Sequence, residues 1–223
     1  MFGPLPAPRD ESGQVVVEAA IVLPLALLAL LGLLQLALVQ EARLLLEYAA
    51  HRAARAGALW NADPERMARA ARPILGAIVC PSRWSALPCP PKDQPLLRAA
   101  AGAAALRAVA ATGGFPGLEV EEVDPPRLPA GLRELDFDRT DLDADGRAAL
   151  LLTVRLRYWL ELKIPFADAA IWHAWHAVGA RRLPLARRIA VEAAAASGHY
   201  FVPLETTHTA RMQSNRFTPE VAP

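Results

Sequence analysis

Two residues at the start of a long apolar run are of types that can take part in chemistry. Gly13 separates a polar leader from the apolar residues, and a flexible backbone without a side chain offers a protease easy access. Glu18 lies one helical turn inside the run, where burying a lone carboxylate is costly. We therefore expect Glu18 to pair with a cation delivered by another copy of the chain. The alternative is that its side chain reaches the membrane interface and stays solvated.

The apolar run itself covers residues 19–40, which are 22 residues without a charge. As a helix it measures about 33 Å, which matches the ~30 Å hydrocarbon layer of a bilayer. Apolar residues surround this helix on all sides, so the run predicts one transmembrane span. The alternatives are a buried core helix and a cleaved signal peptide, whose apolar core is shorter, about 7–15 residues, and follows basic residues.

Two signals disagree about the orientation of this span. The basic residues next to it are Arg9 before it and Arg43, Arg52 and Arg55 after it. Counted alone, they place the C-terminal side in the cytoplasm, although acidic residues are interleaved on both sides. Cys80 and Cys89 lie in a proline-rich segment and are the only cysteines in the sequence. A single pair of cysteines with no third one is typical of a disulfide in an oxidising compartment. Two free thiols are the alternative.

Three aspartates at alternate positions, Asp141, Asp143 and Asp145, precede Gly146 in the pattern that opens a calcium-binding loop. Leu152 stands where such a loop needs its closing glutamate. The pattern also fits an acidic turn between strands. We therefore predict no cofactor and keep calcium at the three aspartates as the alternative.

Residues 172–176, Trp-His-Ala-Trp-His, place two histidines one helical turn apart, a spacing that can bind a metal. Since no cysteine or acidic partner lies next to them, we expect an amphipathic segment whose tryptophans pack against a neighbour or the membrane interface. A basic cluster follows at Arg181, Arg182, Arg187 and Arg188. Such a cluster can contact lipid headgroups or another subunit, and more often it forms a solvated face.

The composition excludes several classes of protein. The 223 residues include 24 Lys and Arg against 23 Asp and Glu, so the net charge of +1 argues against nucleic acid as a partner. With 53% hydrophobic and 21% charged residues, the chain is not disordered. It carries no nucleophile elbow, P-loop, zinc-protease or dinucleotide motif, so we predict that it is not an enzyme.

The remaining patterns predict an α+β fold. Residues 41–55 continue the apolar helix without a breaker, and Gly57 is typical of a C-cap. Asp63 followed by Pro64 favours the start of a second helix, which Pro73 would bend or end. We expect a third helix over 96–111 and strands over 118–123, 148–164 and 203–213. These strands should form a small antiparallel sheet on the outer half of the long helix.

The N-terminal motif also has a family likeness. The chain shows G-Q-x-x-x-E from Gly13 to Glu18, a proline in the apolar run at Pro24, and an Ala- and Arg-rich continuation. Over residues 12–58 this combination resembles the TadE-like branch of the type IV prepilin family, in the Tad (tight adherence) pilus system. In that family the glycine precedes a cleaved bond, and the glutamate is the fifth residue after the cut. A looser likeness recurs at Ile164–Phe166 and over residues 202–213.

The resemblance implies a pseudopilin or minor pilin with a pilin-like fold. It implies a leader over 1–13, a transmembrane and extended helix over 14–58, and an extracytoplasmic domain over 59–223. A prepilin peptidase would cut between Gly13 and Gln14 on the cytoplasmic face of the bacterial inner membrane, freeing an α-amine that pairs with Glu18 of a neighbour. The implied partners are other pilus subunits, the inner-membrane assembly platform and membrane lipid, and assembly would place the chain in an extracellular pilus. The alternative is a membrane-anchored binding or scaffold protein that keeps its leader and never polymerises.

Overall fold

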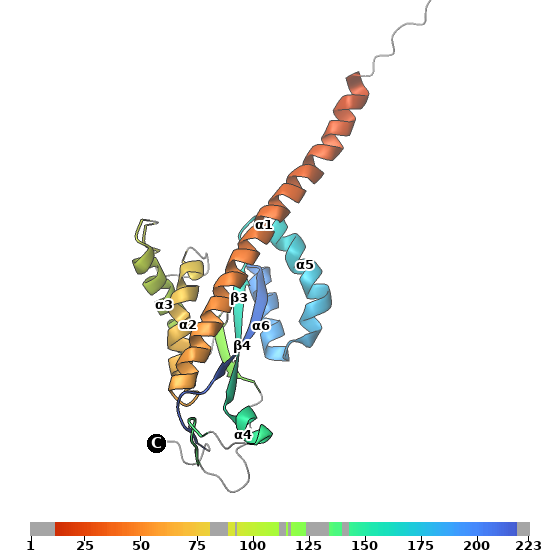
Figure 1. Ribbon diagram of the computed structural model, residues 1–223. Helices are drawn as coiled ribbons and strands as arrows, with labels where there is room; N and C mark the ends of the chain where they lie inside the picture. Colours follow the sequence, from red (N-terminus) through yellow and green to blue (C-terminus); the bar gives the residue numbers. More distant parts are fainter. Residues whose placement is uncertain are drawn as a thin grey trace, which may run out of the picture.

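The computed structural model describes residues 12–80, 89–91, 93–111, 115, 117–123, 134–139 and 143–217. One long helix projects from a head that is built of shorter helices and sheets, as Figure 1 shows. The N-terminal half of this helix extends alone, whereas its C-terminal half is packed into the head. The architecture is the α+β arrangement that the sequence predicts, with antiparallel strands on the outer half of the long helix.

Helix α1 runs from Ser12 to Leu59 as one helix of 48 residues, about 72 Å long. Pro24 lies inside it, and α1 continues past that residue. Within the head, the buried face of α1 consists mostly of small side chains: Ala42, Leu46, Ala49, Ala50, Ala53 and Ala54. Because most of these side chains are short, the neighbouring helix and sheet approach the backbone of α1 closely.

The end of α1 differs from the prediction of a C-cap at Gly57, because α1 continues through that residue. A Cβ at Gly57 would lie 2.6 Å from both Leu152 Cδ2 and Met67 Sδ. A larger residue at Gly57 would therefore displace the side chains of Leu152 in β3 and Met67 in α2. The chain turns instead at Asn61 and Ala62, whose φ angles are 50° and 58°.

Helix α2 (Pro64–Val79) packs against α1, and helix α3 (Pro95–Ala111) packs against α2. Asp63 caps α2 as predicted, since its Oδ1 accepts the N–H groups of Glu65 (2.9 Å) and Arg66 (3.3 Å). Pro73 was predicted to bend or end this helix; it lies inside α2, so the helix does not end there. Packing against α1 and α3 outweighs the one backbone hydrogen bond that a proline cannot donate.

Two glycines bring α2 and α3 into backbone contact. A Cβ at Gly76 would overlap the carbonyl oxygen of Ala99, and a Cβ at Gly102 would overlap the carbonyl oxygen of Gly76. No larger residue fits at either position without separating the two helices.

The main sheet has three antiparallel strands in the order β1–β3–β4, over Leu118–Glu122, Leu151–Glu161 and Phe201–Arg211. Along β3, Leu152, Val154 and Leu156 are buried, whereas Arg157 faces outward and pairs with Glu205 of β4 at 2.8 Å. This is the half-exposed strand that the alternating sequence predicts. A smaller antiparallel sheet pairs β2 (Glu134–Leu135) with β5 (Arg216–Phe217).

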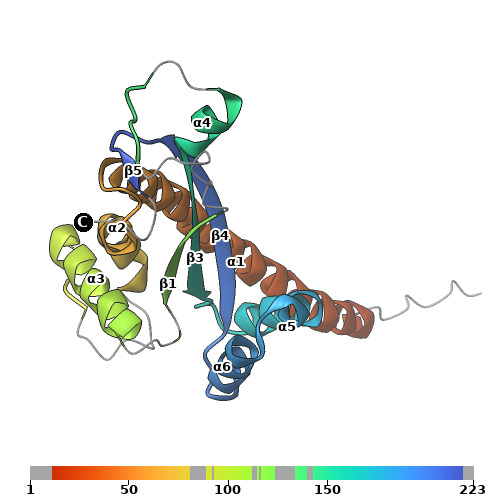
Figure 2. The same cartoon turned by 90° about the horizontal axis from the view of Figure 1, so that it is seen from below.

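Helices α5 (Ala167–Gly179) and α6 (Leu185–Ala196), joined by the 3₁₀ turn η1 (Ala180–Arg182), lie away from α2 and α3 on the other side of α1 (Figures 1 and 2). A short helix, α4 (Ala144–Ala149), precedes β3. Helix α6 was not predicted, although a proline followed by a run of strong helix formers marks its start.

Candidate functional site

The N-terminal half of α1 exposes apolar side chains in all directions. From residue 15 to residue 34 no side chain is buried, and the most apolar window has a mean hydropathy of 2.6. As a helix this stretch measures about 30 Å, the thickness of the hydrocarbon layer. The core helix of a soluble protein would be mostly buried, so the structure favours a membrane anchor.

Glu18 lies exposed at the N-terminal end of this stretch. Within the part of the chain that the structure describes, its carboxylate has no ion pair or hydrogen bond. The backbone of Gly13 and Gln14 belongs to the first turn of α1. The bond between them thus lies where a helix lacks four of its hydrogen bonds and frays most easily.

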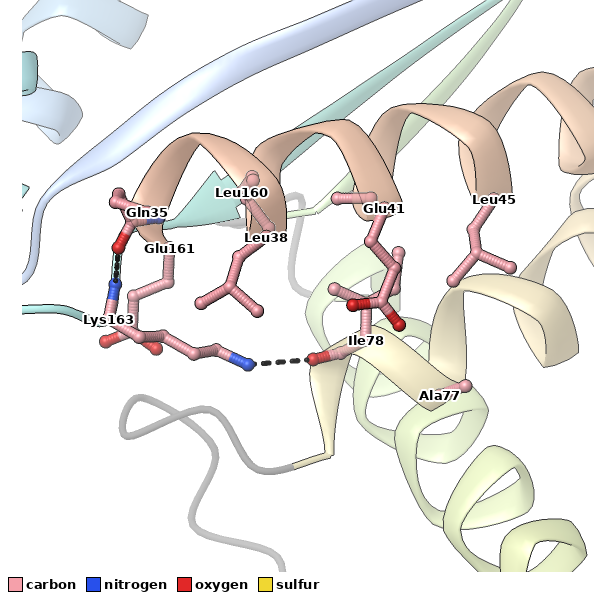
Figure 3. Close-up of a pocket in the computed structure, with 10 residues that line it drawn as sticks. Gln35, Leu38, Glu41, Leu45, Ala77, Ile78, Leu160, Glu161 and Lys163 are labelled. Atoms are coloured by element: carbon pink, nitrogen blue, oxygen red, sulfur yellow. Dashed lines mark hydrogen bonds between the residues drawn. The ribbon is translucent and has the colours of Figure 1, made fainter. Parts of the chain in front are cut away.

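Gln35 joins α1 to the head. Among the described side chains from residue 15 onward it is the first one buried, and its Oε1 accepts the N–H groups of Lys163 (3.0 Å) and Ile164 (2.9 Å) (Figure 3). These two residues follow β3 after Leu162, beyond the last residue that pairs with β4. Gln35 therefore clamps the end of β3 to α1. It was not predicted, although Gln35 and Gln40 are the only polar residues in the uncharged run.

A cavity of about 200 Å³ lies beside this clamp, between α1, the end of α2 and the end of β3. Nζ of Lys163 crosses it and donates to the carbonyl oxygen of Ile78 at 3.3 Å (Figure 3). Burial lowers the pKa of Lys163, because desolvation of the ammonium outweighs its attraction to Glu161 and Glu41. The carboxylate of Glu161 is buried and lies 2.8 Å from Nδ1 of His199. The junction between anchor and head therefore contains charged groups that compensate one another.

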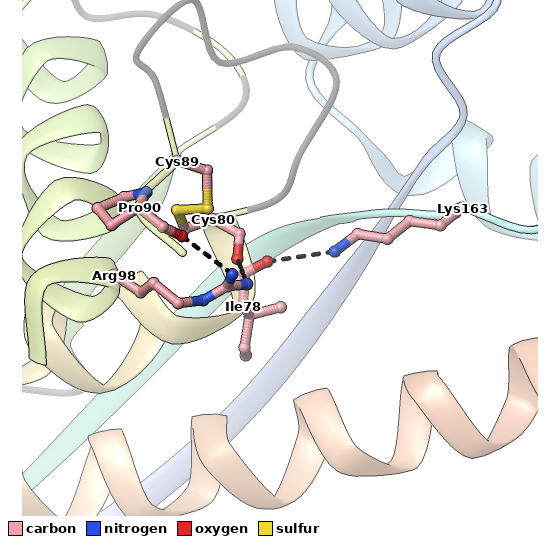
Figure 4. The surroundings of a disulfide bond; sticks show 6 residues. All are labelled: Ile78, Cys80, Cys89, Pro90, Arg98 and Lys163. Atoms are coloured by element: carbon pink, nitrogen blue, oxygen red, sulfur yellow. Dashed lines mark hydrogen bonds between the residues drawn. A yellow bond between two sulfur atoms is a disulfide. The ribbon is translucent and has the colours of Figure 1, made fainter. Parts of the chain in front are cut away.

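Cys80 and Cys89 are joined in a disulfide, with an S–S distance of 2.01 Å and a Cα–Cα distance of 5.5 Å. Arg98 of α3 holds both ends of this loop, since it donates to the carbonyl oxygens of Cys80 (2.8 Å) and Pro90 (3.2 Å). Figure 4 shows these contacts next to the hydrogen bond from Lys163. The disulfide and the Gln35 clamp thus lie at the same end of the head.

Comparison with known proteins identifies a family that the N-terminal region matches. Residues 13–55 match the family described as TadE-like protein. These residues form a TadE-like domain. The match confirms the resemblance over the N-terminal motif, whereas no curated protein and no solved structure is significantly similar to the chain. A TadE-like domain implies a protein associated with the Tad pilus, in a pilin-like family that is generally non-enzymatic.

The TadE-like domain contains Glu18, the whole exposed stretch of α1 and the Gln35 clamp. Its match ends at residue 55, inside the helix and before the head's other elements. The looser likeness at Ile164–Phe166 and over 202–213 therefore stays a prediction.

Outside the TadE-like domain, Asp143 caps helix α4, since its Oδ1 accepts the N–H group of Gly146 at 2.7 Å. Asp141 and the side chain of Asp145 lie outside the described residues. Among the side chains that the structure does describe, no three acidic, histidine or cysteine groups are placed to hold a metal. Calcium at this loop stays a prediction, and capping a helix is the role that the structure gives Asp143.

The two histidines of α5 contact their own chain. The ring of His176 stacks on Trp172 at 4.6 Å, and its Nε2 lies 3.2 Å from Glu192 of α6. Trp175 meets Trp159 of β3 edge-on at 6.5 Å. The tryptophans thus pack inside the head, as expected for an amphipathic segment against a neighbouring element.

The four arginines of the basic cluster near α6 fall into two halves, of which one forms ion pairs within the chain. Arg187 pairs with Glu119 at 2.6 Å and Arg188 with Glu192 at 3.0 Å. Arg181 and Arg182 in η1 are exposed. Half of the cluster therefore stabilises contacts within the chain.

Proposed function

We propose that the chain is a pseudopilin or minor pilin, a structural component of a Tad-type pilus. The observation that carries the proposal is the exposed apolar half of α1, ending in the exposed Glu18, within a TadE-like domain. Lipid covers this half while the subunit is in the inner membrane, and helices of other subunits cover it after assembly. Residues 1–13 are then the leader, 14–58 the anchor and its extension, and 59–223 the extracytoplasmic domain.

In this proposal Glu18 sets the register between subunits. Cleavage between Gly13 and Gln14 frees an α-amine, and Glu18 of a neighbour provides the matching carboxylate. Such a buried pair adds little net stability, because desolvating both charges is costly, but every other register leaves both charges unpaired. Glu18 thus acts on assembly rather than on folding or insertion.

Two features support an extracytoplasmic head on an anchor that is retained. The disulfide of Cys80 and Cys89 is typical of an oxidising compartment. Gln35 lies within the apolar run and holds the end of β3, so a signal-peptide cut after that run would remove part of the folded head. A prepilin-type cut after Gly13 leaves Gln35 in place.

The second candidate is a membrane-anchored scaffold that keeps its leader and does not polymerise. One observation favours it: the bond between Gly13 and Gln14 belongs to α1, and helical backbone must open before a protease can cut it.

The N-terminal mass of the native protein separates the two candidates. A processed subunit begins at Gln14, and a scaffold begins at Met1. Gly13→Leu is expected to leave the precursor intact, whereas the matched control Gly32→Leu is processed normally, because open space surrounds Gly32 on α1. Native protein that begins at Met1 beside an active prepilin peptidase would contradict our proposal.

Glu18→Ala tests the assembly step. Membrane levels are expected to stay constant, because the apolar residues that follow drive insertion without this charge. Incorporation into the pilus or its assembly complex is expected to fall, as measured by cross-linking to the other subunits. Glu47→Ala is the control, since Glu47 forms an exposed pair with Arg43 on the same helix, beyond the apolar stretch. Equal incorporation of Glu18→Ala and wild type would make Glu18 a merely interfacial residue.

A further inference from the structure

Three contacts define the end of the head that faces the anchor. Gln35 of α1 holds the backbone of Lys163, and Lys163 donates to the carbonyl oxygen of Ile78 near the end of α2. The carbonyl oxygen of Cys80 accepts from Arg98 in the first turn of α3. These contacts hold the end of β3, the end of α2 and the beginning of α3 near one another (Figure 4). Helix α5 begins soon after Lys163, where the exposed half of α1 leaves the head (Figure 1).

Large apolar side chains are exposed at this end. Phe166, directly before α5, is 75% exposed, and Leu96 and Leu97 at the start of α3 are 84% and 56% exposed. Helices α5 and α3 lie on opposite sides of α1 (Figure 1); Phe166 directly precedes α5, and Leu96 and Leu97 belong to the first turn of α3. The nearby Asp93 is exposed as well, which makes this end of the head amphipathic.

Phe166 owes its position to an unusual backbone conformation. Its φ of 69° and ψ of −46° lie near the rare, strained γ-turn, which bulky residues seldom adopt. The turn is nevertheless well bonded, since Asp168 N–H donates to the carbonyl of Ile164 (2.8 Å) and Ala170 N–H to that of Phe166 (3.1 Å). A costly conformation that presents an apolar ring to the outside is typical of a functional contact.

The position of this end relative to the bilayer follows from α1. The exposed apolar part of α1 covers residues 15–34 and matches the ~30 Å hydrocarbon layer, so the span ends near Gln35 and not at Gln40, where the uncharged run ends. The headgroup region adds about 5–7 Å on each side. The turn that is bound to Gln35 then lies at the level of the headgroups. We infer that this end of the head rests on the lipid surface, with Phe166 on one side of α1 and Leu96 and Leu97 on the other buried in the bilayer interface. The inference depends on α1 being the anchor of the proposed function.

Spin labels on the full chain in vesicles of phosphatidylethanolamine and phosphatidylglycerol test this contact. The only two cysteines are joined in the disulfide, so Phe166→Cys and Leu96→Cys each introduce a single free thiol. We expect both labels to collide several-fold less often with a water-soluble nickel chelate than a label at Leu185→Cys. Leu185 is the matched control, because it is 72% exposed and begins α6, which follows η1 at the opposite end of α5 from Phe166.

A fourth label, at Leu28→Cys inside the apolar stretch, reports on the anchor itself. If Leu28 is shielded while Phe166 and Leu96 are as accessible as Leu185, the lipid contact is overturned and the anchor stands. If Leu28 is accessible to the chelate, the proposed function fails. Shielding of Phe166 and Leu96 only when other pilus subunits share the vesicle would assign this surface to protein and overturn the lipid contact.

Phe166→Gly distinguishes a membrane role from a structural one. Glycine adopts positive φ without strain, so this variant is expected to unfold in detergent at the same or a higher denaturant concentration than wild type. Unfolding at a clearly lower concentration would mean that the ring stabilises the head, and the lipid contact would be overturned.

Discussion

Gln35→Leu is expected to loosen the head from its anchor. Leucine has nearly the same size as glutamine, so little space is lost or gained, but the acceptor of two backbone N–H groups disappears. Each buried donor without a partner costs about 1–3 kcal/mol, so we expect a loss of about 2–4 kcal/mol for the half-buried pair at Lys163 and Ile164. Membrane insertion is expected to be unaffected, because the substitution removes a polar group from the apolar run.

Denaturant titration of the full chain in detergent micelles measures this loss. Tryptophan fluorescence reports on the head, where Trp159 and Trp172 are buried, and hydrogen exchange at Lys163 and Ile164 reports on the clamp. The control is Gln40→Leu, the same chemical change at an exposed position of α1, which should stay within about 0.5 kcal/mol of wild type. If the two variants unfold at the same denaturant concentration, Gln35 does not hold the head.

Three further substitutions, with one control, test the packing, the charge and the covalent links of the head. Gly102→Ala places a Cβ against the backbone of α2 and is expected to cost about 1–3 kcal/mol in thermal unfolding. Gly32→Ala has open space and is expected to be neutral. Hydrogen bonds from the Arg72 guanidinium hold the pKa of Glu65 below its ordinary value of 4.5. The pair therefore stabilises the head fully above pH 4.5, and this stabilisation is lost as the pH falls through the lowered pKa of Glu65 in the folded state. Glu65→Gln should therefore flatten the acid limb of stability against pH. Cys80→Ser is expected to cost about 2–3 kcal/mol through loop entropy, and thiols in fresh membranes that react with an alkylating agent without reductant would contradict the disulfide.

Local signals in the sequence predict much of the head. The alternation of apolar and charged residues along β3 predicts a strand with one buried face, and in the structure Arg157 on the outer face lies opposite Glu205. Asp63 before Pro64 predicts the start of α2, because a short acidic side chain can accept the free N–H groups of a first helical turn. These features depend on neighbours within a few residues.

Features that depend on distant residues escaped prediction. Gly57 has the sequence context of a C-cap, and its packing role depends on Leu152, almost a hundred residues later. The acceptor role of Gln35 likewise depends on backbone donors more than a hundred residues away. Gly13 and Glu18 stand out in the sequence because their signals are local, a small residue before an apolar run and a charge inside it, and their roles stay predictions.

The continuity of α1 through the clamp has a rotational consequence. No break or hinge separates the apolar half from the half that carries the head, so the head turns only when the whole helix turns. Each residue of a helix advances it by about 1.5 Å and rotates it by about 100°. The number of residues between Glu18 and Gln35 therefore sets the rotation of the head about the axis of α1, relative to the Glu18 side chain. Inserting one residue there would swing the head by about 100°, whereas inserting seven would nearly restore its direction. The length of this helix segment therefore determines which face of the head is exposed to the surroundings.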